Sequence, residues 1–285
     1  MDPLVELPHL LRLLDDNDPA VREPVALRLR EFSGDLSEPL AALGIDLSPA
    51  EQATLGDLLR PARRRDLLGE WQVPSGGWPA LADDWDRVEA LLRLVADFLH
   101  NGVTLRASLH DALDLLADEF EACDAQLLSA DALREFLFTS GRLVGNKSDF
   151  YNPHNSDLCW AIENGRSNPL GLSLIYILVG RRLNLPIEAC NFPGHFLCRI
   201  DAAETTAIVD CFNGGRIHPL DEMLAPDVKL SPAARKALEV PAAAGEVLMR
   251  TLRNLEHSFA RLDQEEDQQL FRTLRKSLEP NPGSF

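Results

Sequence analysis

The spacing of apolar residues changes along the chain, and this change limits the fold more than any other feature of the sequence. Over most of the chain, apolar residues recur every three or four positions, as in amphipathic helices. Between residues 187 and 212 this pattern gives way to three short segments rich in β-branched and aromatic residues: IEACNF, HFLCRI and TTAIVDCF. Because Pro193-Gly194 and Asn213-Gly214-Gly215 punctuate these segments, we expect antiparallel strands there. The sequence thus predicts a helix-rich α+β fold with a small antiparallel sheet.

The first 45 residues predict a helical hairpin. Asp18 is suited to cap the second helix and Pro19 to occupy its first position, whereas Pro24 removes a backbone donor and is expected to bend that helix. The stretch LLRLLDDNDPAVRE resembles a single HEAT repeat, and we find no second copy. Because such repeats need neighbours to bury their faces, we expect this hairpin to cap the main domain. The apolar residues of its two stripes are Leu7, Leu10, Leu11, Leu14, Val21, Val25, Leu29 and Phe32.

Domain boundaries follow from loops and from later helical stripes. The stretch QVPSGGWPALADD, rich in proline and glycine, predicts a linker near residues 72–84. Further helical stripes follow it, and Asn168 with Pro169 is expected to open a longer helix. Beyond Gly245, two more apolar stripes, ended by Pro280, predict a second helical hairpin. We therefore expect three regions: residues 1–72, residues 79–224 and residues 225–285.

Composition excludes several classes of partner. The chain has 45 Asp and Glu against 28 Lys and Arg, a net charge of -17, and such a field repels nucleic-acid backbones and anionic lipid headgroups. The longest apolar run, Leu170 to Gly180, is far shorter than the ~18 residues of a membrane span, and the acidic start resembles no signal peptide. The five Cys residues include no CxxC pair, so reduced thiols are expected. We predict a cytoplasmic protein that binds neither nucleic acid nor membranes.

The predicted strands bring a histidine and a carboxylate together. If Ile200 and Thr205 close a four-residue turn, His195 stands opposite Asp210 with the two Cβ atoms ~5 Å apart. At this distance the carboxylate fixes the tautomer of the imidazole. Such a pair supplies two groups of a nucleophilic triad, in which the acid orients the base and the base activates a Ser or Cys. The alternative is a histidine that is merely packed in its strand.

Several motifs surround this pair, within about residues 136–222: Asn155-Ser156, Leu172-Ser173-Leu174, Pro193-Gly194-His195-Phe196, and Asp210 with Phe212-Asn213-Gly214-Gly215. As a set, they resemble the transglutaminase-like core of the bacterial SirB family. The helical tail, which contains LMRTLRNLEHSF, is similar to the tetratricopeptide-like end of that family, whereas the first 70 residues fall outside it. The resemblance implies a papain- or transglutaminase-like core flanked by helical hairpins.

The resemblance also points to a missing group. In catalytically active members of the wider superfamily, a Cys opens the long helix that precedes the His strand. A helix N-terminus and a neighbouring imidazolium both lower the pKa of a thiol there. Counting back from Leu185-Pro186 places this position at Pro169, which is a good first helical residue and cannot be a nucleophile. His195 and Asp210 are then expected to be a vestigial pair, with a structural role or as parts of a binding cleft.

Substitutes for the missing thiol are weak candidates. Ser173 lies one turn beyond Pro169 on the same helix face, ~6 Å further along, and would need His195 to reach it. Alternation within a strand predicts that Cys211 points away from the face of Asp210. The other three thiols in this region are expected in the core or on the preceding helix: Cys190, Cys198 and Cys159.

A metal site is a further alternative. Asp149, His154 and Asp157 carry suitable oxygen and nitrogen atoms, but their spacing is irregular and the sequence offers no fourth ligand nearby. Asn155 or Ser156 is better explained as the cap of the next helix. We predict no metal and no cofactor.

Three functions remain open. The missing Cys favours a non-catalytic transglutaminase-like protein that acts through protein–protein contacts. The second possibility is a hydrolase or acyl transferase that uses an unusual Ser or Cys on amide or thioester substrates. In the third, the terminal hairpins bind partners and the centre is a scaffold. The identity of the residue that starts the helix over residues 169–183 distinguishes the first function from the second.

Overall fold

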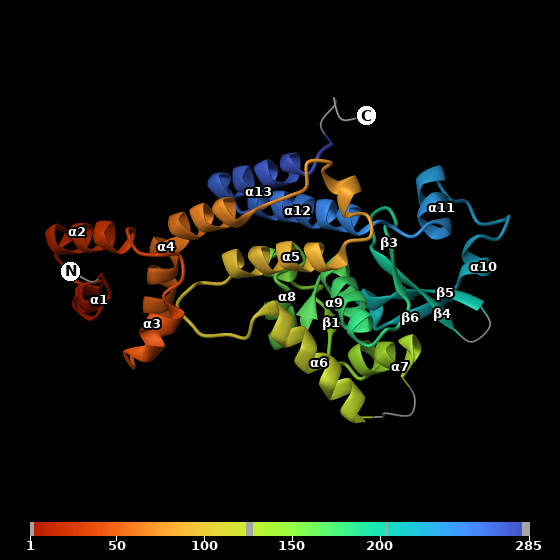
Figure 1. Ribbon diagram of the computed structural model, residues 1–285, viewed down its shortest axis with the longest axis horizontal. Coiled ribbons are helices and arrows are strands. Elements are labelled where there is room, and N and C mark those ends of the chain that lie inside the picture. The colour runs from red at the N-terminus through yellow and green to blue at the C-terminus, as the bar shows by residue number, and fades with distance from the viewer. Residues whose placement is uncertain (1–2, 124–127, 203–204, 281–285) are drawn as a thin grey trace. The chain divides into compact units, whose positions relative to one another are not determined.

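The structure is a computed structural model that describes residues 3–123, 128–202 and 205–280 (Figure 1). These described residues form two compact units. The first unit contains the residues up to 72 together with 97–106, and the second contains residues 73–96 together with those from 107 onward. The predicted helix-rich α+β fold with a small antiparallel sheet is confirmed, whereas the three predicted regions stay a prediction about domains.

The first unit is helical. It contains α1 (Pro3–Arg12), α2 (Pro19–Leu29), α3 (Ser37–Ala42) and α4 (Pro49–Glu70). Helices α1 and α2 lie where the sequence predicts a hairpin, and Asp18 caps α2 by accepting a hydrogen bond from Ala20 N–H at 2.9 Å. Helix α2 continues past Pro24 to its end at Leu29. The apolar stripes meet in one core, which includes Leu7, Leu11, Leu14, Val25, Leu29, Leu55 and Leu59.

Helices also make up most of the chain between the linker and the main sheet. They are η1 (Trp78–Leu81), α5 (Trp85–Leu99), α6 (Leu109–Cys123), α7 (Ala130–Arg134), η2 (Glu135–Thr139), η3 (Pro153–Ser156), α8 (Leu158–Asn164) and α9 (Pro169–Arg182). Helix α8 begins after Asp157, whose carboxylate accepts from Trp160 N–H at 3.1 Å. The predicted cap at Asn155 or Ser156 is therefore wrong, because these two residues belong to the short 3-10 helix η3.

Helix α9 is the central helix of the second unit. It begins as predicted, with Pro169 in its first position and Asn168 as the cap, which accepts from Gly171 N–H at 2.9 Å. Every residue from Pro169 to Gly180 is buried. A helix that is buried on all sides belongs to the interior of a domain. The structure thus fixes the N-terminus of α9 in the core, next to the candidate site.

The main sheet of the described residues is antiparallel, with the strand order β3-β4-β5-β6. Its strands are β3 (Ile187–Cys190), β4 (Leu197–Ala202), β5 (Thr205–Asp210) and β6 (Arg216–Pro219), and a separate parallel pair joins β1 (Val144–Gly145) to β2 (Arg166–Ser167). Strand β6 was not predicted, because RIHP is short and has one β-branched residue. The predicted β4–β5 register is wrong by two residues, since Thr205 pairs with Ala202 and not with Ile200.

Helices cover both faces of this sheet. Helix α9 packs against β3 and β4. On the other side, α10 (Leu220–Met223) and α11 (Pro232–Glu239) close a cluster in which Leu238 meets Cys190, Leu197 and Ile208. The sheet is therefore held between layers, and its ends carry the loops of the candidate site.

The chain ends in a second helical hairpin, as predicted. Helices α12 (Ala244–Arg261) and α13 (Glu265–Ser277) lie side by side (Figure 1), and the rings of Phe259 and Phe271 stack with centroids 5.4 Å apart. At the start of α12, Gly245 approaches the Trp78 carbonyl so closely that a Cβ would overlap it. The hairpin is thus joined to the core through η1.

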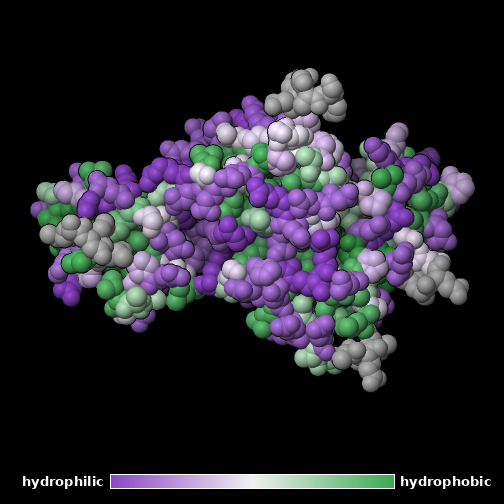
Figure 2. Space-filling model, in the orientation of Figure 1, coloured by the Kyte–Doolittle hydropathy of each residue, from purple (hydrophilic) through white to green (hydrophobic). Residues whose placement is uncertain are grey.

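Polar residues cover most of the face shown in Figure 2, and apolar residues appear there in scattered groups. Among the described residues, no helix is both long enough and apolar enough to cross a membrane.

Candidate functional site

His195 and Asp210 are in direct contact. His195 lies in the loop before β4, and Asp210 is the last residue of β5. The imidazole Nε2 is 2.8 Å from the carboxylate Oδ1, and the two side chains are 29% and 12% exposed. The predicted contact is present although the predicted register is wrong. His195 precedes β4 and does not lie on a strand as predicted, so the loop that carries it, and not a cross-strand pair, brings its ring to Asp210.

The carboxylate of Asp210 is held from two directions. Besides the imidazole, it accepts hydrogen bonds from the backbone N–H of Asn213 at 3.1 Å and from its Nδ2 at 2.8 Å. Burial opposes ionisation of this carboxyl, but the hydrogen bonds from His195 and Asn213 outweigh burial and hold the pKa of Asp210 below its usual value. Asp210 is therefore a fixed anion that orients the imidazole. Asn213 belongs to one of the sequence motifs, but its contact with Asp210 was not predicted.

The geometry leaves the second nitrogen of His195 available. A carboxylate accepts hydrogen bonds, so the neutral imidazole carries its proton on Nε2 and a lone pair on Nδ1. Nδ1 has no hydrogen-bond partner among the described residues. The ring packs edge-on against Phe212, with centroids 6.0 Å apart. An imidazole oriented in this way is suited to accept a proton from a nucleophile.

Pro169 lines a cleft beside this histidine. The cleft has a volume of about 230 Å³, and its walls include Pro169, Gly194 and Phe196, the last two being the sequence neighbours of His195. A Cys at the first position of α9 would lie at a helix N-terminus facing the histidine loop, which is an arrangement that lowers the pKa of a thiol. In this chain the position carries a proline ring and no nucleophile.

The start of α9 is packed closely enough to give a prediction. A Cβ on Gly171 would overlap the Oγ of Ser167 and lie 2.6 Å from the carbonyl oxygen of Asn155. We expect Gly171→Ala to lower the free energy of unfolding by about 1–3 kcal/mol, because the crowded backbone has to shift. Urea denaturation measures the change.

The matched control is Gly69→Ala in the last turn of α4, where a Cβ would meet nothing within 4 Å. Because Ala is the better helix former, this variant is expected to gain up to about 1 kcal/mol. Equal effects of the two substitutions would contradict the tight packing around the N-terminus of α9.

The structure also places Ser173 and Cys211. Ser173 is fully buried, and its Oγ forms no hydrogen bond to any residue that the structure describes, so His195 does not reach it. The prediction that Cys211 lies on a strand is wrong. Strand β5 ends at Asp210, which caps the 3-10 helix η4 (Cys211–Asn213), and Cys211 begins that helix. Its Sγ lies 3.9 Å from that of Cys198 in the core.

The remaining thiols are mostly buried. Burial raises the pKa of the Cys190 thiol to about 11 and raises that of Cys198 as well, so both stay protonated near neutral pH. Cys159 is buried in α8, whereas Cys123 is exposed at the end of α6. Thiols of this kind are core residues, apart from Cys123.

The three residues of the alternative metal site have separate contacts. Asp149 accepts a hydrogen bond from Asn152, Asp157 caps α8, and the ring of His154 stacks on Trp160 with centroids 5.8 Å apart. Within the described ranges, no group of three or more His, Cys, Asp or Glu residues is arranged to hold a metal ion.

One wall of the cleft comes from α12, which the sequence analysis assigned to the tail. Arg250, Asn254 and Ser258 line the cleft at four-residue spacing, together with His257. The signal was present as a polar row beside the apolar stripe of this helix. A polar row is ordinarily a solvent-exposed face, so no local feature indicated that this row lies at the site.

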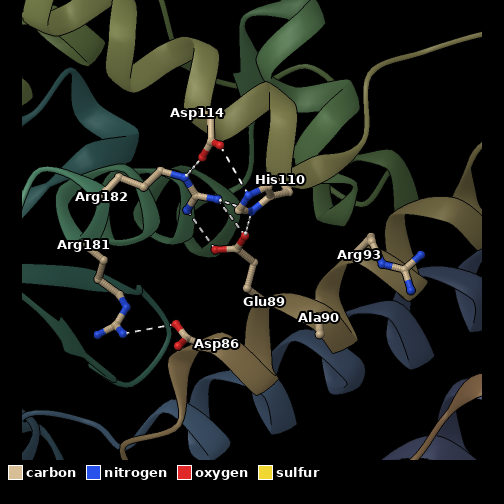
Figure 3. Close-up of a pocket in the computed structure, with 8 residues that line it drawn as sticks. All are labelled: Asp86, Glu89, Ala90, Arg93, His110, Asp114, Arg181 and Arg182. Carbon is tan, nitrogen blue, oxygen red and sulfur yellow. Dashed lines mark hydrogen bonds and ion pairs between the residues drawn. The ribbon is translucent and has the colours of Figure 1, made fainter.

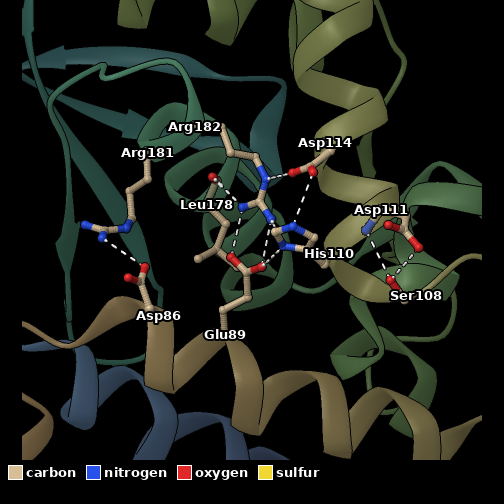
Figure 4. A network of polar contacts seen from close by, with 9 residues as sticks. All are labelled: Asp86, Glu89, Ser108, His110, Asp111, Asp114, Leu178, Arg181 and Arg182. Carbon is tan, nitrogen blue, oxygen red and sulfur yellow. Dashed lines mark hydrogen bonds and ion pairs between the residues drawn. The ribbon is translucent and has the colours of Figure 1, made fainter.

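A second cavity, of about 410 Å³, lies between α5, α6 and the end of α9 (Figure 3). Arg182 donates to both carboxylate oxygens of Glu89, at 2.7 and 2.8 Å, and to Asp114 at 2.5 Å (Figure 4). His110 lies between the two carboxylates, 3.3 Å from each. Because these charges are matched against one another, we interpret the cluster as an ion-pair network that joins three helices.

Comparison with known proteins gives the chain a family. Residues 104–253 match the transglutaminase-like superfamily. A UPF0162 protein of Xylella fastidiosa (strain Temecula1) is 35% identical over 172 residues, which cover 56% of this chain and 60% of the relative. F-box only protein 21 of Homo sapiens is 28% identical over 137 residues, which cover 47% of this chain and 21% of that protein. No solved structure matches the chain.

The chain spans about 60% of the length of the Xylella relatives that it matches. The superfamily match extends beyond the motifs on both sides, reaching into α12, and it includes Pro169, His195 and Asp210. It covers more than half of the chain. This protein therefore belongs to the transglutaminase-like superfamily.

Proposed function

We propose that this chain is a non-catalytic, SirB-type transglutaminase-like protein that acts by binding a protein partner in the cleft beside His195. One observation carries the proposal: Pro169 occupies the first position of α9 on the wall of that cleft. The chemistry of an active superfamily member requires a nucleophile at this place. The His195–Asp210 pair is then a vestige that shapes the cleft.

The surrounding groups support the same proposal. A substitute nucleophile needs access to substrate and a hydrogen bond to the base. Ser173 has neither, since it is fully buried and its Oγ lacks a partner in the described part of the chain. Burial also keeps Cys190 and Cys198 protonated, and a protonated thiol is a poor nucleophile.

The second candidate is a Cys- or Ser-dependent hydrolase or acyl transferase acting on amide or thioester substrates. The preserved geometry of His195 favours it, because Asp210 orients the ring and leaves Nδ1 able to accept a proton. This candidate requires a nucleophile from somewhere other than position 169.

Labelling with iodoacetamide tests the Cys-dependent form of the second candidate. We expect the native chain to be labelled once, at the exposed Cys123, at the rate of an accessible thiol in an unstructured peptide. In Cys123→Ser the labelling should fall at least about tenfold, because the other thiols are buried. A further rapidly labelled Cys, whose reactivity is lost in His195→Ala, would support the enzyme and contradict a non-catalytic protein.

The terminal hairpins are a separate part of the proposal. We propose that the α1–α2 hairpin is HEAT-like and that the α12–α13 hairpin is tetratricopeptide-like, each offering a surface for contacts. Partner capture by the full-length chain tests which surface binds. Loss of the partner in a cleft variant such as His195→Tyr supports the cleft, whereas loss on changing the exposed Leu27 of α2 supports the hairpin.

We also propose that the protein is cytoplasmic and that its partner is neither nucleic acid nor a membrane. These two proposals rest on the net charge of -17 and on five Cys residues without a CxxC pair. The proposal includes no cofactor and no metal.

A further inference from the structure

The polar row on α12 faces the start of α9 across the cleft. Arg250, Asn254 and Ser258 line the same cavity as Pro169 and Leu170. Residues four apart on a helix lie in one row, so these three side chains follow the length of the wall. The side chains of Asn254 and Ser258 form no hydrogen bond to any residue in the described ranges.

Ser258 is the first sign of a ligand. It is 8% exposed, and its hydroxyl borders the cavity without a protein partner among the described residues. The residue is largely buried, but the hydroxyl oxygen itself is not closed off, so water or a ligand in the cleft can supply its hydrogen bond. The cleft is the direction from which that partner can come.

Arg250 is the second sign. Its Nη1 donates to Asn191 Oδ1 and to the carbonyl oxygen of Phe192, the latter at 2.9 Å, and both acceptors are neutral. No carboxylate pairs with it in the described part of the chain, and the exposed Arg253 repels it. Burial of this guanidinium lowers its pKa, as expected of a cation without a counter-charge.

The rest of the lining agrees with an anionic ligand that has an apolar body. Although the chain carries 45 acidic residues, no Asp or Glu lines this cleft in the described residues. Phe150, Tyr151 and Phe196 provide aromatic walls, and the guanidinium of Arg250 lies 5.2 Å from the centroid of Phe196. Leu170, at the second position of α9, presents a backbone N–H without an intrahelical acceptor.

We propose that this cleft binds a peptide carboxylate that is carried next to an aromatic or large apolar side chain. The carboxylate accepts hydrogen bonds from Arg250 and Ser258 near the N-terminus of α9, and the side chain lies against the aromatic walls. The volume of about 230 Å³ is below the ~300–1,000 Å³ of sites for drug-sized ligands, which suits one or two residues of a peptide. The inference rests on the proposed function, because it takes the cleft as a binding site.

Fluorine NMR with small probes tests the inference on the full chain. The first probe is N-acetyl-para-fluorophenylalanine as the free acid, and the second is its amide, which keeps the ring and removes the charge. A ligand of this size is expected to bind with a Kd near ~1 mM. We expect the amide to bind at least about tenfold more weakly, since hydrogen bonds to a charged group are the strong ones.

Variants assign the contacts. Arg250→Met should weaken binding of the acid at least about tenfold, and Ser258→Ala about threefold or more. Ser258→Ala keeps the fold, because the hydroxyl has no protein partner to lose. Arg253→Met is the matched control on the same helix, outside the lining, and should change binding by less than about twofold. A third probe, whose carboxylate is a glutamate side chain beside para-fluorophenylalaninamide, distinguishes an acidic side chain from a chain terminus.

Equal binding of acid and amide, or no binding of any probe up to ~10 mM, would overturn the inference. An equal loss in Arg250→Met and Arg253→Met would overturn it as well, because the attraction would then be unspecific. These outcomes leave the proposed function standing, since that proposal is tested separately, by the search for a His195-dependent nucleophile and by partner capture with the His195→Tyr variant.

Discussion

An Arg182→Met variant is expected to lose about 2–4 kcal/mol of unfolding free energy, because it leaves two carboxylates without their cation. Arg182 makes two hydrogen bonds to Glu89, one to Asp114 and one to the carbonyl of Leu178 at 3.1 Å (Figure 4). The side chains of Arg182 and Glu89 are only 16% and 18% exposed, so water replaces little of what is lost. Met retains most of the apolar stem, so the charge is the main change. Urea denaturation measures the difference.

The neighbouring residue provides the control. Arg181 lies 3.5 Å from Asp86, but these side chains are 41% and 96% exposed. An exposed ion pair contributes little, so Arg181→Met is expected to change stability by less than about 1 kcal/mol. Equal losses in the two variants would show that the network around Arg182 has no special structural role.

The stability difference has a defined pH dependence. Burial opposes ionisation of Glu89, but the hydrogen bonds and charges of Arg182 and His110 outweigh it and hold its pKa below the usual value. A carboxyl with a lowered pKa in the folded state stabilises the protein above its unfolded pKa. That contribution is lost as the pH falls through the folded pKa. The difference in unfolding free energy between wild type and Arg182→Met is therefore expected to be largest at neutral pH. It should decrease below about pH 4.3, the ordinary pKa of Glu.

The sequence was sufficient for features that depend on local chemistry. Asn168 and Pro169 indicate the start of α9, because helix capping and the preset φ of proline depend on only a few neighbouring residues. The contact of His195 with Asp210 was also predictable, since a hairpin brings nearby segments together. The register between β4 and β5 was not predictable, because it depends on how the turn after β4 closes. An error of two residues in the register leaves the alternation of side chains unchanged, so the alternation does not reveal it.

Features that depend on packing between distant segments could not be read from the sequence. The row of Arg250, Asn254 and Ser258 has the spacing of a solvent-exposed helix face, and only the placement of α12 makes it a wall of the cleft. The network of Arg182 with Glu89 likewise joins residues 93 positions apart. The sequence around the α12 row does not indicate that the row borders the cleft, and the sequence around Arg182 does not indicate that Glu89 lies next to it.

A Pro169→Cys variant is expected to contain a thiol with a strongly lowered pKa, about 1–3 units below the ordinary ~8.5. Asn168 keeps the helix start, the first turn of α9 favours an anion, and His195 with Asp210 supplies the base and its orienting acid. Loss of the proline ring should cost under about 1 kcal/mol, because the ring mainly restricts the unfolded chain. At mildly acidic pH the new thiol is expected to react with iodoacetamide at least about tenfold faster than Cys123.

The decisive measurement is the ultraviolet absorbance of the thiolate as a function of pH, in Pro169→Cys and in Pro169→Cys combined with His195→Ala. Both variants carry Cys123→Ser, so that the native thiols that remain are buried, and burial raises the pKa of Cys190 and Cys198. If position 169 is the place of the missing nucleophile, the thiol titrates well below ~8.5 in the first variant and closer to ~8.5 in the second. A thiol that titrates near ~8.5 in both would contradict the account, because residue 169 would then not face His195.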